Sequence, residues 1–280
     1  MKIGGVLVGD RSEPKVMGII NVSPESFYKG SVRIGEREIA AAAKQMREQG
    51  THIIDIGAMS TAPYLETVIP VDEETRRMKQ AIRAVKSSCD LPVSVDTPRA
   101  TVAEEAIRLG ADAINDVTGL KYDSKMAEVA SKAGVPVIAG AYNRTRATGR
   151  LSSTLAALKE SIAIAKKAGV KDVIVDPSIG FFREEGKNQF FTKMTDMPWY
   201  ARDIEVLSRL DKLSTLNKPV CVSVSRKSFI GHLLNVQIEN RLIPSIVCEA
   251  VAVLNGASII RTHNVQETVQ ALTMLQLLKP

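Results

Sequence analysis

The sequence of 280 residues lacks several features that mark common protein classes. Aromatic residues make up only 4% and no run of five like charges occurs, so the net charge of +6 gives weak support to a nucleic-acid surface. No apolar run approaches the ~18 residues of a membrane span, and residues 1–10 are too glycine-rich for a signal peptide. We therefore expect a soluble, cytoplasmic protein.

Cysteine is also scarce. Cys89, Cys221 and Cys248 are odd in number and lie in apolar surroundings, which predicts reduced core residues rather than disulfides. No spacing of histidine, cysteine and carboxylate side chains indicates a zinc site held by the protein. A Gly-x-Ser-x-Gly motif and a Gly-x-Gly-x-x-Gly fingerprint are both missing, which disfavours a serine hydrolase and a dinucleotide-binding sheet.

The chain does have a regular alternation of short apolar runs and amphipathic segments. The runs predict eight strands, at 16–22, 53–57, 93–97, 113–117, 136–140, 172–177, from Pro219 onward, and 258–263. The segments between them predict helices at 36–49, 72–88, 99–109, 123–133, 153–168, 199–213, 243–255 and 266–278. An open doubly wound sheet usually stops at five or six strands. We therefore predict an α/β fold of the (β/α)8 TIM-barrel type, a single domain over residues 1–280 with a short N-terminal β-hairpin lead within residues 1–15.

Polar side chains stand at the carboxyl ends of all these strands except the fifth, which ends at Gly140. They are Asn21, Asp55, Asp96, Asn115, Asp176, Ser225 with Lys227, and Arg261 with His263. Taken singly, each of these residues has an ordinary explanation as a turn residue or a helix N-cap. Because the strand ends of a barrel converge on one mouth, their coincidence predicts a ligand site there.

One group of these side chains suits a planar heterocycle. Asp96, Asn115 and Asp176 offer two carboxylates and an amide to a ring with several N–H donors and a carbonyl. Lys227 would complement a ring carbonyl or nitrogen.

A second group suits an anion. Arg261 and His263 are two apart on one strand, and therefore on the same face, where with Asn21 they would bind phosphate or pyrophosphate. An Mg²⁺ ion would be held mainly by the pyrophosphate oxygens, with Asn21 as a hard oxygen ligand.

The segments MGIINVSPESF, IIDIG, VSVDT, AINDV, DPSIGF, SRKSFIG and IIRTH resemble, in this order, the motifs of dihydropteroate synthases. The resemblance extends from about Met17 to the C-terminus. It implies a transferase that condenses 6-hydroxymethyl-7,8-dihydropterin pyrophosphate with an arylamine and releases pyrophosphate. It also implies Mg²⁺ as cofactor, a homodimer, and no nucleic-acid or membrane partner, and we expect an archaeal-type member.

The resemblance implies a role for each matching position. The pterin would be bound by Asp96, Asn115, Asp176 and Lys227, and the pyrophosphate by Asn21, Arg261 and His263, with Asn21 on the metal. The arylamine would lie beside Thr61, Ser225 and Ser228. Asp55 would favour the positive charge that develops on the reacting methylene, and with Asp96 and Lys227 it forms the expected catalytic set.

The chain departs from the family pattern on the arylamine side. The turn after the second strand usually reads Ser-Thr-Arg-Pro, but here Ala62 replaces the arginine and Met59 stands where an acidic residue is common. The fifth strand lacks the family's His-Met segment. In the loop after the sixth strand, Phe182 and Arg183 replace the usual glycine-lysine.

These departures leave the amine open between p-aminobenzoate and a ribosylated aminobenzene phosphate of the kind used for methanopterin. The loop with Arg144, Arg146 and Arg150 would meet such a phosphate, because arginine forks suit phosphate oxygens. The alternative is a solvated basic loop without a ligand.

Two other functions remain open at this stage. A corrinoid-linked methyl-tetrahydropterin methyltransferase on the same barrel would need neither Mg²⁺ nor pyrophosphate, and the SRKSFIG segment, Asn21, Arg261 and His263 disfavour it. A non-catalytic pterin-binding protein is compatible with Ala62 and the altered fifth strand, and turnover of any amine would exclude it.

Overall fold

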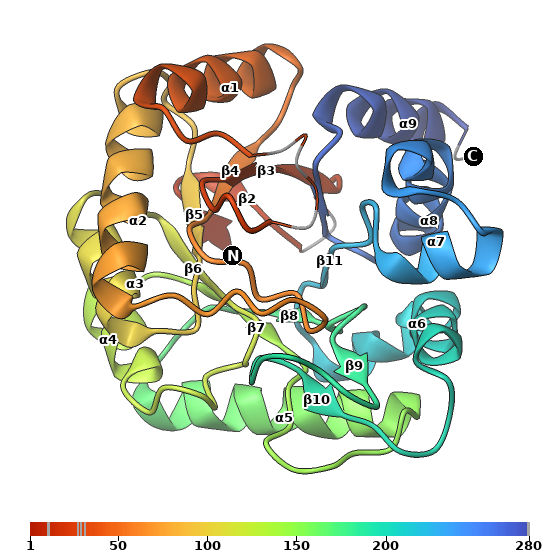
Figure 1. Cartoon of the computed structure of the whole chain (residues 1–280). Coiled ribbons are helices and arrows are strands. Elements are labelled where there is room, and N and C mark those ends of the chain that lie inside the picture. Colours follow the sequence, from red (N-terminus) through yellow and green to blue (C-terminus); the bar gives the residue numbers. More distant parts are fainter. Residues whose placement is uncertain (10–11, 27, 29, 31, 279–280) are drawn as a thin grey trace.

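The computed structural model describes residues 1–9, 12–26, 28, 30 and 32–278. Eight parallel strands form one sheet in the order β11-β12-β3-β4-β5-β6-β7-β8. A parallel bridge between Val175 and Val220 joins the two edge strands, so the sheet is almost closed. Helices surround it on the outside (Figure 1). The predicted TIM barrel is confirmed.

The barrel strands are β3 (Lys15–Asn21), β4 (Ile53–Gly57), β5 (Val93–Asp96), β6 (Ala113–Asp116), β7 (Val137–Gly140), β8 (Val173–Asp176), β11 (Cys221–Val222) and β12 (Ile259–Thr262). The α-helices are α1 (Glu36–Glu48), α2 (Val71–Lys86), α3 (Ala100–Arg108), α4 (Met126–Ala133), α5 (Leu151–Ala168), α6 (Trp199–Ser208), α7 (Ser228–Leu234), α8 (Leu242–Leu254) and α9 (Val265–Leu277). Two 3₁₀ helices follow α6 and α7, η2 (Leu210–Leu216) and η3 (Ile238–Arg241). None of these described helices is long and apolar enough to cross a membrane.

The strand sequences are apolar because both faces of each strand are buried. A parallel strand that is covered inside and outside reads as a continuous apolar run, as in the fully buried Ile53–Gly57. The outer covering is the apolar stripe of each helix, which in α2 consists of Met78, Ala81, Ile82 and Val85.

The N-terminal lead closes one end of the barrel. The predicted hairpin is confirmed as antiparallel β1 (Lys2–Ile3) and β2 (Val6–Leu7); residues 10–11 of the lead lie outside the described residues. Ile3 and Val8 are fully buried. They join a cluster with inward side chains near the amino ends of seven strands, namely Met17, Ile53, Ala113, Ile138, Ile174, Cys221 and Ile259. The chain's N-terminus accordingly lies within the ring of helices in Figure 1. Only the carboxyl ends of the strands remain for a ligand.

Three details differ from the sequence-based expectations. The segment after the seventh strand contains α7, a helix of seven residues that is too short to show a clear apolar periodicity. The helix expected from Asp123 begins at Met126, because the Asp123 carboxylate accepts hydrogen bonds from the backbone N–H groups of Ala100 and Lys125. The helix expected at 199–213 ends at Ser208 and continues as η2.

Candidate active site

The strand register places the predicted polar residues at one level of the barrel mouth. Asn21 pairs with Gly57, Gly57 with Asp96, and Asp96 with Asn115 across four neighbouring strands. A β-carbon at Gly57 would lie 3.1 Å from the Asn21 Oδ1 atom, so the absence of a side chain there gives the asparagine its room. The strands β3, β5 and β6 therefore present polar side chains at one level, with Gly57 of β4 leaving space between them.

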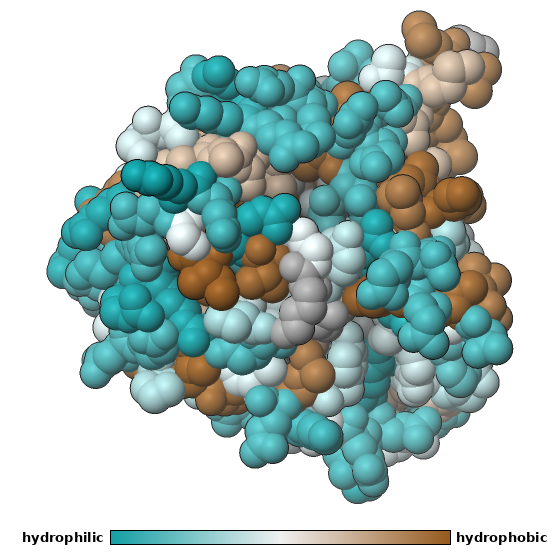
Figure 2. All heavy atoms as spheres, turned by 45° about the horizontal axis from the view of Figure 1, so that its top comes forward, coloured by the Kyte–Doolittle hydropathy of each residue, from teal (hydrophilic) through white to brown (hydrophobic). Residues whose placement is uncertain are grey.

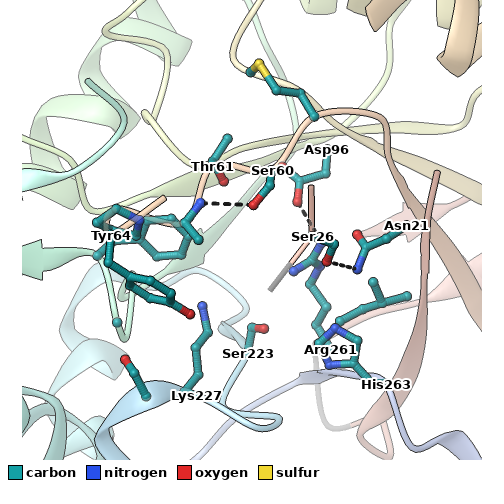
Figure 3. Close-up of a pocket in the computed structure, with 17 residues that line it drawn as sticks. Asn21, Ser26, Ser60, Thr61, Tyr64, Asp96, Ser223, Lys227, Arg261 and His263 are labelled. Atoms are coloured by element: carbon teal, nitrogen blue, oxygen red, sulfur yellow. Dashed lines mark hydrogen bonds and ion pairs between the residues drawn. The ribbon is translucent and has the colours of Figure 1, made fainter. Parts of the chain in front are cut away.

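A cavity opens over these side chains (Figure 3). Its inner part is lined by Thr61, Asp96, Asn115, Val117, Asp176, Ser178, Ile179, Phe181, Ser223, Lys227 and Arg261. Its outer part shares six of these residues and adds Ile19, Asn21, Ser26, Met59, Ser60, Ala62, Pro63, Tyr64, Gly180, Ser228 and His263. All four predicted pterin-binding residues and all three predicted pyrophosphate-binding residues are thus brought together.

Arg261 connects the two predicted groups. Its Nε donates to Asp55 Oδ2 and its Nη2 to Asp96 Oδ2, both at 2.6 Å. Asn115 Nδ2 donates to the same Asp55 oxygen at 3.2 Å. Asp55 is fully buried beneath the cavity and does not line it, although its Oδ1 atom has no hydrogen-bond partner among the described residues. Its predicted catalytic role stays a prediction.

Burial raises the pKa values of the predicted pterin-binding carboxyl groups and lowers the pKa of Lys227. Desolvation raises the pKa of Asp96 to about 7 even though Arg261 opposes the shift. Desolvation also lowers the pKa of Lys227 to about 8, assisted by the charge of Arg261. Asp176 has a raised pKa, again because it is buried. A ligand that satisfies these groups with hydrogen bonds would stabilise their charged forms.

At the anion end, His263 is neutral at ordinary pH. Burial, followed by the charges of Arg261 and Lys227, holds its pKa well below the usual value. Its Nδ1 lies 3.2 Å from the Ser225 hydroxyl, which also accepts a hydrogen bond from the His263 backbone N–H. The side chain of Tyr28, from the loop after β3, packs edge-on against the imidazole.

The loop after β8 is held by a buried ion pair. Arg202 donates to the carbonyl oxygens of Pro177 and Ser178 and lies 3.2 Å from Asp203, whose carboxylate accepts the Gly180 N–H. Gly180 has a φ of +87°, and a β-carbon there would lie 3.1 Å from Lys227. This loop therefore needs glycine where it passes Lys227.

The predicted arylamine residues are only partly brought together. Thr61 and Ser228 line the cavity, whereas Ser225 is 1% exposed, hydrogen-bonded to His263, and absent from the lining. Sequence reasoning missed Ser223, Tyr64 and Phe181. Ser223 precedes Ser225 by two positions, so strand alternation was the signal that could have found it. Tyr64 and Phe181 lie on loops, where no periodic signal exists.

The predicted phosphate-binding loop is exposed. Arg144 Nη2 lies 3.5 Å from the Tyr122 carbonyl oxygen, and Arg150 lies 3.6 Å from Asp196. Arg146 borders a shallow hollow outside the cavity, together with Arg183 and Lys193. None of the three arginines lines the cavity.

The site offers few protein ligands for a metal ion. In the part of the chain that the structure describes, no group of three or more histidine, cysteine or carboxylate side chains could hold a metal ion. Asn21 offers one amide group at the cavity wall. The residues present therefore fit only an ion whose other ligands come from a bound anion or water.

Comparison with known proteins agrees with this geometry. The profile of the family described as "Pterin binding enzyme" matches residues 17–263. The chain belongs to the pterin-binding enzyme family.

Within this family, the chain is similar to dihydropteroate synthases. It is 36% identical to the one from Clostridium beijerinckii over 284 residues, which is 99% of each chain, and 36% identical to the one from Bacillus subtilis over 93% of this chain and 87% of that one. Two solved dihydropteroate synthases with pteroic acid superpose with TM-scores of 0.82. They are from Clostridium difficile (34% identity; 96% and 97% of the two chains) and Coxiella burnetii (36%; 95% and 93%).

Relatives also occur in archaea. A probable bifunctional folylpolyglutamate synthase/dihydropteroate synthase from Haloferax volcanii is 35% identical over 92% of this chain, which corresponds to 30% of that longer protein. Because pterin-binding relatives come from both bacteria and archaea, the expectation of an archaeal-type member stays a prediction.

Proposed function

We propose that this pterin-binding enzyme condenses 6-hydroxymethyl-7,8-dihydropterin pyrophosphate with an arylamine and releases pyrophosphate. The observation that carries the proposal is the division of the cavity. Asn115 and Asp176 line only the inner part, and Asn21 and His263 line only the outer part. Asp96, Lys227 and Arg261 line both. Relatives that match the whole chain have the same activity in their names.

The inner end would bind and orient the pterin ring. The carboxylates of Asp96 and Asp176 accept ring N–H groups, while Asn115 and the Lys227 ammonium donate to ring oxygen or nitrogen. A site built from such buried polar groups rejects rings that leave them unpaired. The reactive methylene of the pterin would then point toward Arg261.

The outer end would stabilise the departing pyrophosphate. Arg261 is engaged with Asp55 and Asp96, so the arriving negative charge competes with those two carboxylates for the guanidinium. As the C–O bond breaks, positive charge grows on the methylene and negative charge on the pyrophosphate. The Asp55 carboxylate, beneath Arg261, would stabilise the positive charge on the methylene. Arg261, Asn21 and His263 would stabilise the negative charge on the pyrophosphate. The amine nitrogen then attacks the methylene carbon, and its proton passes to the released pyrophosphate or to water.

Mg²⁺ is proposed as the cofactor of this step. Asn21 would contribute one oxygen ligand, and the pyrophosphate oxygens would supply the rest. When bound, the ion neutralises charge on the leaving group.

The arylamine would enter from the side of Thr61, Ser228, Tyr64 and Phe181. We propose p-aminobenzoate as the amine, since two solved relatives from Xanthomonas albilineans and Thermus thermophilus contain 4-aminobenzoate. A ribosylated aminobenzene phosphate stays a second candidate because Arg146, Arg183 and Lys193 border one hollow beside the cavity.

A homodimer is proposed for the assembly, with the chain acting as one domain over residues 1–280. The helix α8 has an exposed apolar stripe of Ile243, Val247, Val251 and Leu254, exposed by 76%, 58%, 36% and 60%. Met274 and Leu277 on the neighbouring α9 extend it. Hydrophobic residues gather on that side of the molecule in Figure 2. Such a stripe is typical of a covered surface.

The test is pyrophosphate release from the pterin pyrophosphate with Mg²⁺, with and without each amine. We expect release that depends on p-aminobenzoate. Release only with the phosphorylated amine would identify that amine as the substrate and give Arg146 a role in binding its phosphate. No release with either, together with binding of a methylated tetrahydropterin without Mg²⁺, would refute the proposal in favour of a methyltransferase; pterin binding without any turnover would indicate a binding protein.

A further inference from the structure

Arg183 is a buried cation that borders the hollow outside the cavity and contacts Ser228, a residue of the cavity lining. Its side chain is 6% exposed, and it stacks on the Trp199 ring with 3.7 Å from the guanidinium carbon to the ring centroid. Nη2 donates a hydrogen bond of 2.6 Å to the Ser228 hydroxyl. Nη1 is buried without a hydrogen-bond partner among the described residues.

Among the buried arginines that the structure describes, Arg183 is the one that bonds neither a carboxylate nor a carbonyl oxygen. Arg99 pairs with Glu74, and Arg202 with Asp203, while Arg226 donates to backbone carbonyl oxygens and to Asn264. Within the described residues no carboxylate oxygen lies within 4.0 Å of the Arg183 guanidinium. The Asp203 carboxylate acts on Arg183 only from beyond this distance. A buried charge without a close counter-ion is unfavourable, and a ligand of opposite charge would stabilise it.

The backbone aims Arg183 toward the arylamine side. It belongs to β9 (Phe182–Arg183), which pairs with β10 (Thr192–Lys193) in the loop after β8. Phe181 lines the cavity, Phe182 turns away and packs beneath Arg202, and alternation returns residue 183 to the side of Phe181. Its hydrogen-bond partner Ser228 lines the same cavity.

The direction of the hydrogen bond between Arg183 and Ser228 leaves the serine hydroxyl as a hydrogen-bond donor. Because its oxygen accepts an N–H from Arg183, its own hydrogen is free to donate into the cavity. The adjacent positive charge strengthens that donor toward a negatively charged acceptor. Ala62, which also lines the cavity, supplies no cation.

We propose that Arg183 is a specificity-determining residue that selects an anionic arylamine. It acts as a positioning residue, polarising the Ser228 hydroxyl toward the amine's carboxylate and contributing its positive charge from behind it. This rests on the proposed condensation. Trp199 fixes the plane of the guanidinium, and Trp199 in turn contacts His232 of α7, the helix that begins with Ser228.

The test compares p-aminobenzoate with the neutral p-aminobenzamide in the variants Arg183→Met and Arg183→Lys. For Arg183→Met we expect the KM of p-aminobenzoate to rise by about ten- to a hundredfold, as for loss of a charged hydrogen-bonding partner. The KM of p-aminobenzamide and that of the pterin pyrophosphate should change less than about threefold. Arg183→Lys keeps the charge and should preserve most of the discrimination. Arg209→Met, which removes an exposed arginine paired with Glu205, is the matched control.

A second readout needs no turnover. Trp199 is the chain's single tryptophan, so its fluorescence reports on ligands next to Arg183. Benzoate should change the wild-type emission and have a weaker effect on Arg183→Met. Equal changes in KM for both amines, or none, in variants with wild-type melting temperatures would overturn the proposal. Wild-type turnover is measured first, and its absence would refute the condensation itself; the benzoate titration would still test Arg183.

Discussion

The two ends of the cavity are built differently. At the proposed pterin end, three of the four residues lie on strand ends that the sheet register holds in place, namely Asp96 on β5, Asn115 on β6 and Asp176 on β8. The fourth, Lys227, directly precedes α7. The proposed arylamine end consists mainly of loop residues, Thr61 and Tyr64 after β4 and Phe181 after β8, with Ser228 at the start of α7.

The arylamine loops depend on each other rather than on the sheet. Asn188 Nδ2 donates to the carbonyl oxygens of Ala62 and Leu65, and the Lys187 N–H donates to the Pro63 carbonyl oxygen. This difference gives a physical reason why the departures noted in the sequence, such as Ala62 and Arg183, fall on the loops. A strand-end residue cannot change without disturbing the barrel, whereas linked loops can change together.

The largest expected effect is at the pterin end. Asp96→Asn removes the carboxylate that accepts a hydrogen bond from Arg261 and, as proposed, another from a pterin N–H group. We expect kcat/KM for the pterin pyrophosphate to fall by about a hundredfold or more. The matched control is Asp112→Asn, whose carboxylate pairs with Lys86 and caps the amino end of β5. Steady-state kinetics of the two variants give the kcat/KM values to compare. An equal loss in both variants would mean that the effect is structural.

The pH dependence of pterin affinity sharpens the same comparison. Asp96 becomes a carboxylate above about pH 7 and Lys227 stays protonated below about pH 8. Both are charged between these values, so the Kd of 6-hydroxymethyl-7,8-dihydropterin should be lowest there and weaken by about tenfold per pH unit outside. Lys227→Arg should move the alkaline limit upward. A flat calorimetric profile from pH 5.5 to 9.5 would contradict this view of the site.

A smaller effect is expected when the loop contacts are removed. Asn188→Ala should raise the KM of the arylamine about fivefold and leave the KM of the pterin pyrophosphate unchanged, because it loosens one end only. Asn255→Ala is the matched control, since that amide also donates to two carbonyl oxygens, those of Leu207 and Ser208. If both KM values rose together in Asn188→Ala, the two ends would not be independent.

The smallest effect is expected from restoring a cation to the turn after β4. Ala62→Arg should lower the KM of p-aminobenzoate about two- to fourfold and leave that of p-aminobenzamide unchanged, as a partly exposed ion pair contributes little. A tighter KM for the neutral amine would show that size rather than charge is responsible.

The same contrast explains how much could be predicted from the sequence. The barrel and its polar rim followed from apolar periodicity, because Asp96 and Asn115 occupy strand ends whose register leaves few alternatives. The seven-residue helix α7 was too short for such a signal. Two features follow only from packing in three dimensions. They are the ion pair between Arg261 and Asp55, which are 206 positions apart, and the burial of Ser225.

The most direct test of the account is the mass of the product formed from the pterin pyrophosphate, Mg²⁺ and p-aminobenzoate by the wild-type chain. The account predicts a conjugate with one new bond between the pterin methylene and the amine nitrogen, and one pyrophosphate released per conjugate. Release of pyrophosphate with only the hydroxymethyl pterin as product, or no reaction with any arylamine, would contradict it.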